Sequence, residues 1–268
     1  MKILLNKNDL NEALNNVSDI GFVPTMGSLH EGHISLIKRS KKECKKTIVS
    51  IFINPKQFND KNDYKKYPRN RNKDLSILKK LNVDFVFTPK KKDVYDFKRK
   101  IRISKKDKIL CAKYRKGHFE GVIDVMDRLT KMIKPKKIFM GEKDFQQLYL
   151  VKKYLKNKSN SRIILCKTVR DKYKLALSSR NFLLKKGDLN IARVISKNLI
   201  NLRKKTINKN NFKNVISLKI KEFNKFKNVK VEYFELRNKF TLKKSYNKKN
   251  SKFFIAYYLK KIRLIDNF

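Results

Sequence analysis

Short apolar runs alternate with amphipathic stretches between residues 20 and 168, and this alternation constrains the fold more than any other feature of the sequence. The apolar runs are rich in β-branched and aromatic residues, as strands are, and the stretches between them have the apolar spacing of helices. The expected strands are 20–24, 47–53, 83–88, 137–140 and 161–168, and the expected helices are 33–46, 70–81, 122–133 and 144–155. Such alternation predicts right-handed βαβ units and a Rossmann-like parallel sheet.

The pattern changes after Arg180. Two helical segments come first, at 191–203 and 211–226, and two β-rich runs follow, at 229–236 and 253–259. This order predicts a smaller α+β domain. The sequence therefore predicts an α/β protein of two domains. Residues 1–175 are expected to form a Rossmann-like, nucleotide-binding domain, and residues 176–268 a smaller C-terminal domain.

The charge of the chain is strongly positive, with 70 Lys and Arg against 23 Asp and Glu and a formal net charge of +47. Such a balance favours binding to polyanions, nucleic acid included. However, the basic residues are spread along the chain, and Lys, Asn, Ile and Phe are abundant while Gly and Pro are rare, with 7 and 5 copies. An AT-rich coding bias produces the same composition, and we expect no specific nucleic-acid partner.

Composition also limits the class of protein. Apolar residues make up 40% of the chain, enough for a folded core and too many for a disordered chain. No apolar run is long enough to span a membrane, and residues 1–10 do not resemble a secretory signal. Three scattered cysteines, Cys44, Cys111 and Cys166, do not form a disulfide framework or a metal cluster. These features predict a cytoplasmic protein.

Histidine and glycine are rare in this chain, and most of their copies lie in a few segments. All three histidines, His30, His33 and His118, lie in two short stretches. We expect the remaining glycines where a side chain would clash or where φ is positive. Six of the seven glycines lie in or beside the segments that carry polar candidates, namely Gly21, Gly27, Gly32, Gly117, Gly121 and Gly141.

The first such segment, 24–33, lies between an expected strand and an expected helix. His30 and His33 are three positions apart and share a face if the helix begins here. Free amide groups at the helix start would favour phosphate, and Gly32 would let a ligand approach the backbone. Two imidazoles at this place can stabilise the charge of a departing pyrophosphate. The alternative is a capping histidine beside a surface histidine.

The other candidate segments also follow expected strands or precede expected helices. Asn54 and Gln57 offer amide donors and acceptors for a ligand with hydroxyl and carboxylate groups, although a cap and an exposed glutamine are the alternative. Lys143 can neutralise phosphate charge at the start of a helix, where a charged cap is the alternative. The remaining candidates are Arg115 for a triphosphate, His118 in a structural role, and the hydroxyls and guanidinium of 178–180 for a pyrophosphate.

These segments together resemble one enzyme family. His30-Glu31-Gly32-His33 resembles the HxGH signature of the nucleotidylyl-transferase superfamily. The wider set resembles the pantothenate synthetase (pantoate–β-alanine ligase) family over essentially the whole chain. In order, the segments read FVPTMGSLHEGH, VSIFINPKQF, YPR, RKGHFEGV, IFMGEKDFQQL, LALSSRN and IRLIDN. Lys116 stands where the family usually has Pro, and Tyr173-Lys174 where it commonly has Asp-Gly.

The resemblance implies an ATP-dependent ligase that condenses pantoate with β-alanine through a pantoyl-adenylate. It implies His33, His30 and Lys143 as catalytic residues, with His33 as the essential acid or hydrogen-bond donor. Gln57 and Gln147 would bind pantoate, and Gln57 would also face β-alanine. The residues implied for ATP are Met26, Gly27, Ser28, Leu29, His30, Glu31, Gly32, His33, Gly141, Glu142, Lys143, Asp144, Val169, Leu177, Ser178, Ser179 and Arg180.

The resemblance further implies Mg²⁺ on the triphosphate, a homodimer, and a C-terminal domain that acts as a lid over ATP. The protein ligands of the metal stay open, with Asp74 and Asp144 as candidates. Two other functions are kept as alternatives at this point. One is a different HxGH nucleotidylyl transferase with another acceptor, and the other is a degenerate enzyme that binds RNA through its positive charge.

Overall fold

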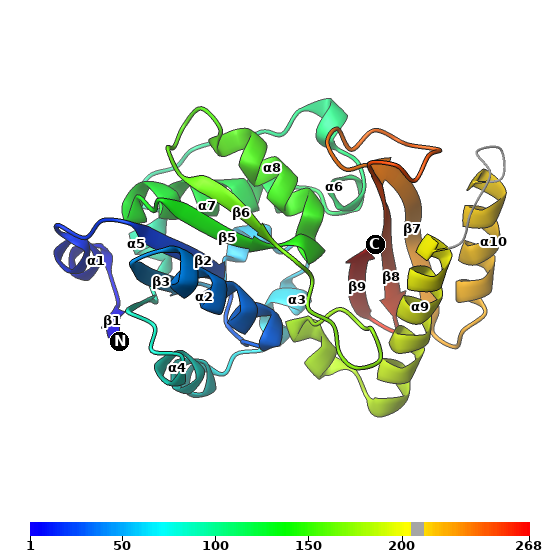
Figure 1. Ribbon diagram of the computed structural model, residues 1–268, viewed down its shortest axis with the longest axis horizontal. Helices are drawn as coiled ribbons and strands as arrows, with labels where there is room; N and C mark the ends of the chain where they lie inside the picture. Colours follow the sequence, from blue (N-terminus) through cyan, green and yellow to red (C-terminus); the bar gives the residue numbers. More distant parts are fainter. Residues whose placement is uncertain (205–211) are drawn as a thin grey trace. The chain divides into compact units, whose positions relative to one another are not determined.

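The computed structural model describes residues 1–204 and 212–268 and divides them into two compact units, Met1–Thr168 and Val169–Phe268 (Figure 1). The domain boundary expected from the sequence, between residues 175 and 176, falls inside the second of these units. Residue 211, where the second helix of the C-terminal region is expected to begin, lies outside the described residues.

The first unit is built on a six-stranded sheet in which every strand pair is parallel. In spatial order its strands are β1 (Lys2–Leu4), β4 (Phe85–Phe87), β3 (Lys46–Ile51), β2 (Ile20–Thr25), β5 (Lys137–Gly141) and β6 (Arg162–Cys166). The predicted parallel sheet is confirmed, and β1 is an edge strand that the sequence did not predict. Parallel strands place all of their carboxyl ends along one edge, where ligands bind in such sheets.

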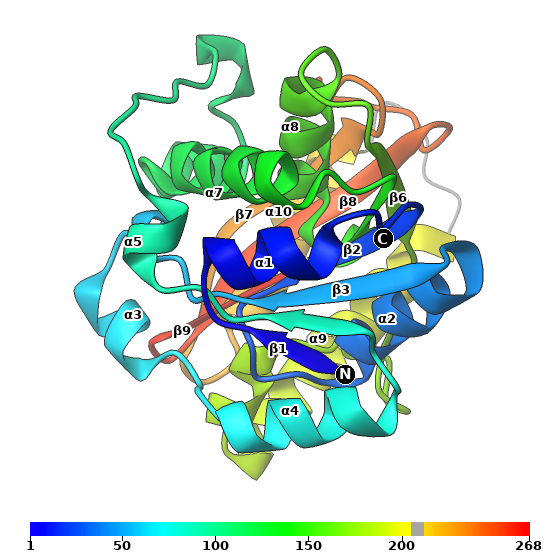
Figure 2. The same cartoon turned by 90° about the vertical axis from the view of Figure 1, so that its left-hand side faces the viewer.

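Helices cover both faces of this sheet (Figure 2). One face packs against α1 (Lys7–Leu14), α7 (His118–Ile133) and α8 (Phe145–Leu155), and the other against α2 (Glu31–Glu43) and α4 (Arg71–Lys80). Neighbouring strand residues enter different cores: Phe22 packs with the first group and Val23 with the second. This alternation explains why the strands read as continuous apolar runs, because both faces are buried.

Shorter helical elements connect these layers. They are η1 (Pro55–Gln57), α3 (Lys61–Lys66), α5 (Lys91–Val94), η2 (Lys105–Asp107), α6 (Cys111–Tyr114) and η3 (Glu142–Asp144). No helix in residues 1–204 or 212–268 is long and apolar enough to cross a membrane. Cys44, Cys111 and Cys166 are buried, and no disulfide joins them.

The second unit contains an antiparallel sheet of β7 (Val229–Asn238), β8 (Ser251–Leu259) and β9 (Ile262–Asn267). Two helices, α9 (Lys186–Lys204) and α10 (Phe212–Asn224), pack on it around Phe212, Phe223 and Phe253. The predicted α+β character of this region is confirmed. The strand β9 contains the IRLIDN segment, which was recognised as a motif and not as a strand.

Gly121 allows α7 to approach the turn η1 unusually closely. A Cβ at this position would overlap with the backbone carbonyl of Lys56. Because the clash is with backbone atoms, no change of a side-chain rotamer can relieve it. The carbonyl of Gly121 also accepts a hydrogen bond of 3.0 Å from Asn54 Nδ2. The glycine thus fixes the position of η1, which carries Gln57.

We predict that Gly121→Ala destabilises the first unit by about 1–3 kcal/mol, the usual cost of overpacking. Thermal unfolding followed by circular dichroism should show a midpoint several degrees lower. Gly187→Ala is the matched control, because nothing lies within 4 Å of a Cβ there and the residue is helical. This control should be neutral or stabilising by up to about 1 kcal/mol. Equal midpoints for the two variants would contradict the packing argument.

Candidate active site

Two neighbouring strands deliver the main candidate residues to one edge of the sheet. β2 ends at Thr25 and β5 ends at Gly141, and the two strands pair in parallel. The loop that carries His30 and the turn that carries Lys143 therefore leave the sheet at the same edge. The positive charge of Lys143 contributes to the lowered pKa of both His30 and His33, in line with their position at this edge.

Asp74 holds the loop that follows β2. Its two carboxylate oxygens accept hydrogen bonds of 2.8 Å each from the amides of Ser28 and Leu29, and its side chain is buried. Ser28 has a φ of 53°, which the sharp turn requires. The suggestion that Asp74 is a metal ligand is therefore not supported, because both of its oxygens are engaged by the backbone. The sequence did not indicate this structural role.

His30 and His33 form a reciprocal cap at the start of α2. Nδ1 of His30 accepts from the amide of Gly32 at 3.1 Å, and Nδ1 of His33 accepts from the amide of His30 at 3.3 Å. A nitrogen that accepts a hydrogen bond carries no proton, so each neutral ring has its proton on Nε2. The ring centroids are 4.1 Å apart. The predicted shared face is present, and neither Nε2–H group donates to a residue within 1–204 or 212–268, so both can serve as donors.

Gly32 is needed for the His30 ring. A Cβ on Gly32 would lie 2.7 Å from Cε1 and 2.9 Å from Nδ1 of His30. A packing role thus accounts for this glycine, and its expected role in admitting a ligand to the backbone stays a prediction. The expectation of free amides at the helix start is wrong for Gly32 and His33, since His30 Nδ1 accepts from the first and the His30 carbonyl, at 2.8 Å, from the second.

The surroundings keep both imidazoles neutral. Burial, and then the nearby Lys143 charge, lowers the pKa of His30 to about 4, against a partial opposing effect of Asp144. Burial, and then the charges of His30 and Lys143, lowers the pKa of His33 to about 3. Neutral rings at neutral pH favour the hydrogen-bond donor over the imidazolium acid, the two roles considered for His33.

Lys143 and Asp144 lie in η3, directly after β5. Their side chains approach to 3.3 Å, with Lys143 largely buried and Asp144 about half exposed. Gly141 has open space around the position of a Cβ, unlike Gly27 and Gly32. A steric clash therefore does not explain why position 141 is a glycine. The open space leaves room for a ligand beside the backbone.

Gln57 is buried and does not have the exposed position that was the alternative. Its Nε2 lies 2.9 Å from Sδ of Met26, which joins η1 to the loop after β2. Asn54 caps η1 by accepting from the amide of Lys56 at 3.2 Å and donates to Gln57 Oε1 at 3.1 Å. The capping alternative is therefore correct for Asn54.

The segment 115–121 supports Gln57 from the backbone side. His118 Nδ1 donates to the Gln57 carbonyl at 2.6 Å, because a carbonyl can only accept. His118 Nε2 then accepts from Arg115 at 2.8 Å, and Arg115 also donates to the same carbonyl at 3.3 Å. The structural role expected for His118 is confirmed, and Arg115 is occupied within this cluster.

The two glutamines at the start of α8 differ. Gln146 is buried and donates to the carbonyls of Asp107 and Ile109, so it holds a loop. Gln147, the predicted pantoate residue, is partly exposed, and its side chain makes no hydrogen bond to another residue in the described part of the chain.

The remaining ATP candidates belong to the second unit and are described within it. Val169 and Leu177 are joined by a hydrogen bond of 3.0 Å across a hairpin whose turn Asp171 stabilises. Lys174 takes a φ of 74° there, so the turn forms despite the departure from the Asp-Gly pattern. Ser178 caps η4 (Ser179–Leu183), whose Ser179 is buried and whose Arg180 is partly exposed.

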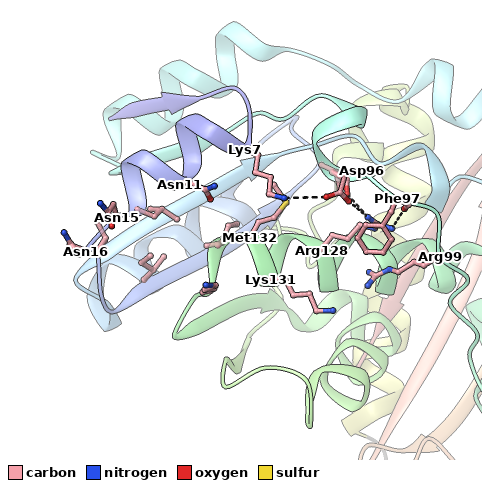
Figure 3. A pocket seen from close by; sticks show the side chains of 16 residues that line it. Lys7, Asn11, Asn15, Asn16, Asp96, Phe97, Arg99, Arg128, Lys131 and Met132 are labelled. Carbon is pink, nitrogen blue, oxygen red and sulfur yellow. Dashed lines mark hydrogen bonds and ion pairs between the residues drawn. The ribbon is translucent and has the colours of Figure 1, made fainter.

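Two cavities lie in the first unit. One, of about 390 Å³, opens at the carboxyl ends of β2, β3 and β4, and Met26 and Gly27 are the predicted site residues that line it. The other, of about 540 Å³, lies between α1 and α7 where β2 begins (Figure 3). Its guanidinium groups are already paired: Arg128 with Asp96 and Arg99 with Asp127. Its place at the amino end of β2 separates it from the imidazoles.

Comparisons with known proteins agree on one family. A family model described as pantoate-beta-alanine ligase matches residues 2–268. A pantothenate synthetase of Francisella tularensis subsp. mediasiatica is 42% identical over 255 residues, covering 93% of this chain and 88% of the relative. A relative with the same description in F. tularensis subsp. novicida is 41% identical with the same coverage.

Solved structures give the same result. A pantothenate synthetase from Thermus thermophilus has a TM-score of 0.89 at 28% identity, and covers 100% of this chain and 99% of its own. A pantoate-beta-alanine ligase from F. tularensis, solved with beta-gamma ATP and beta-alanine, has a TM-score of 0.85 at 37% identity, with coverages of 100% and 97%.

We predict that the three histidines exist as two different tautomers at pH 7. Long-range ¹H–¹⁵N NMR spectra should show His30 and His33 protonated on Nε2, and His118 on Nδ1, with single His→Gln variants providing the assignments. On acidification, His30 and His33 should stay neutral down to about pH 5, where an ordinary imidazole is already charged. Titration of His33 near pH 6.5 would contradict the assigned environment.

Proposed function

The chain belongs to the pantoate–β-alanine ligase family, and from this premise we propose which of its residues carry each part of the reaction. The enzyme condenses pantoate with β-alanine and converts ATP to AMP and pyrophosphate. A carboxylate is a poor electrophile because its leaving group would be oxide, so pantoate first attacks the α-phosphorus of ATP. The amine of β-alanine then attacks the acyl carbon of pantoyl-adenylate. The two alternatives considered from the sequence, a different HxGH nucleotidylyl transferase and a degenerate enzyme that binds RNA, are not favoured.

The paired imidazoles carry the first step. Each ring is held through Nδ1 by a backbone amide, which aims a neutral Nε2–H donor away from the helix start. We assign these two donors to oxygen atoms of the triphosphate, where negative charge grows as pyrophosphate leaves. Donors that are fixed in advance need no reorganisation during the reaction. This fixed orientation is the observation on which the proposal chiefly rests.

Lys143 adds a positive charge beside the two donors. Its proximity to His30 and His33 supports a role in neutralising the departing pyrophosphate. We further assign Met26–His33 and Gly141–Asp144 to ATP binding. In the second unit, we assign Val169 to the adenine side, and Leu177, Ser178, Ser179 and Arg180 to ATP. A lid function of residues 176–268 belongs to the same proposal.

The two glutamines form the proposed acceptor side. Gln57 and Gln147 would bind pantoate, and Gln57 would also face β-alanine. Support comes from Gln57 being buried against Met26, with Nε2 directed to the weakly accepting Sδ atom. A carboxylate or hydroxyl oxygen of the substrate is a much better acceptor and would replace this contact.

We propose that Mg²⁺ enters with ATP. The described residues contain no group of three or more His, Cys, Asp or Glu side chains that could hold a metal, and Asp74 is engaged by backbone amides. The oxygens of the triphosphate suit this cation, and Asp144 is the remaining protein candidate. When bound, the ion would offset the negative charge of the phosphates. Measuring pyrophosphate release as a function of Mg²⁺ concentration tests this role.

A homodimer and a cytoplasmic location complete the proposal. Cys44, Cys111 and Cys166 form no disulfide with one another, which supports a reducing compartment. Sedimentation equilibrium of the purified chain tests the dimer, and a monomer at micromolar concentration would exclude it.

We predict that His33→Ala lowers the rate of pantoyl-adenylate formation by about 10²- to 10³-fold, the scale for loss of a fixed donor. Mass spectrometry should detect pantoyl-adenylate with the wild-type chain, ATP and pantoate, and pyrophosphate release should stop when pantoate is omitted. His33→Gln, which keeps an N–H at a similar reach, should retain more activity than His33→Ala. Near-normal turnover of His33→Ala would exclude the role of His33, and pyrophosphate release that does not need pantoate would exclude the function.

A further inference from the structure

A chain of hydrogen bonds leads from Tyr95 to the side chain of Gln57. The Tyr95 hydroxyl donates to Oδ1 of Asn54 at 2.7 Å, and Nδ2 of Asn54 donates to Oε1 of Gln57 at 3.1 Å. Tyr95 follows α5 and is distant from Gln57 in the sequence, and no motif of the sequence analysis includes it. We propose that Tyr95 is a positioning residue that, through Asn54, orients the Gln57 amide so that its N–H₂ group faces the acyl substrate.

The direction of every bond in this chain is determined. The Lys56 amide can only donate, so the Asn54 atom that it contacts at 3.2 Å is the oxygen. The Gly121 carbonyl can only accept, so the atom that contacts it at 3.0 Å is the Asn54 nitrogen. Asn54 therefore uses both lone pairs and both protons, and it is buried. Gln57 must then turn its oxygen toward Asn54 and its nitrogen away.

Two cations contact the Tyr95 ring. The Lys56 ammonium lies 3.9 Å from the ring centroid, and the Arg128 guanidinium lies 5.0 Å from it. Asp124 binds both cations, at 2.9 Å and 2.8 Å, and so ties them to α7. Burial, and then the charge of Asp124, raises the pKa of Tyr95, so the hydroxyl stays protonated and can donate throughout the neutral range.

The backbone of Gln57 is supported independently of Tyr95. His118 and Arg115 donate to the Gln57 carbonyl, and neither contact involves the side chain. Loss of the Tyr95 hydroxyl should therefore leave the turn in place and loosen only the orientation of the Gln57 amide. Because Gln57 is assigned to pantoate, this inference rests on the proposed function. It predicts a defect specific to pantoate and not to ATP.

The test is Tyr95→Phe, which removes the hydroxyl and keeps the ring in contact with Lys56 and Arg128. By isothermal titration calorimetry, the Kd for pantoate should rise about 3- to 10-fold, the range for one lost hydrogen bond. The Kd for ATP should stay within about twofold of the wild-type value. The thermal midpoint should stay within a few degrees of that of the wild type. In steady-state assays, KM for pantoate should rise more than kcat falls. Tyr154→Phe is the matched control: its ring also lies under a cation, Lys158 at 3.9 Å, and it should bind pantoate like the wild type.

A double-mutant cycle shows whether Tyr95 acts through Gln57. In a Gln57→Ala background, Tyr95→Phe should change the Kd for pantoate by less than about 1.5-fold, because no amide is left to orient. The same fold-change in both backgrounds, an equal loss of ATP affinity, or unchanged pantoate binding in Tyr95→Phe would each overturn the inference. A wild-type chain that neither binds nor adenylates pantoate would overturn the proposed function as well, so the two failures are distinguishable.

Discussion

The Nδ1 atoms of His30 and His33 cap the first turn of α2, and the chemistry assigned to the site depends on this interaction. An N-terminal cap is usually a short polar side chain such as Ser, Thr, Asp or Asn, whose oxygen accepts from a backbone amide of the first turn. An imidazole has a second nitrogen, so capping through Nδ1 determines that Nε2 carries the proton. The same bond thus starts the helix, selects the tautomer and aims the donor. Burial and the Lys143 charge then keep both rings neutral, which preserves their ability to cap.

The rest of the first unit keeps this cap in place. Asp74, on α4, binds the amides of Ser28 and Leu29 and so fixes the turn between β2 and α2. The parallel pairing of β2 with β5 delivers Lys143 to the same edge. On the acceptor side, Gly121 lets α7 touch η1, and the bonds from Tyr95 and Asn54 orient Gln57. The polar side chains of Asp74, Asn54 and Tyr95 are therefore paired within the first unit and hold the site in shape.

Much of this arrangement could be predicted from the sequence. The apolar runs predicted five of the six strands of the parallel sheet. Strands buried on both faces are continuously apolar, so they stand out from the amphipathic helices between them. The helix start at the histidines and the structural role of His118 were also anticipated. By contrast, the edge strand β1 is only three residues long, and so short a strand carries little pattern. Asp74 and Tyr95 could not be recognised, since their partners are 45 or 46 and 41 positions away and depend on the tertiary fold. The packing role of Gly32 could not be predicted, because only the structure shows the His30 ring beside it.

The central claim is that His30 and His33 act as neutral donors, and the pH dependence of the first step tests it most directly. Single-turnover measurement of pyrophosphate release, with ATP, Mg²⁺ and pantoate at saturation, gives the rate constant of adenylate formation. Our account predicts a rate constant that stays level between pH 6.5 and pH 8.5, because both rings are neutral over the whole range. A rate constant that falls about tenfold per pH unit as the pH rises would show that an imidazolium acid is required, and would contradict the account.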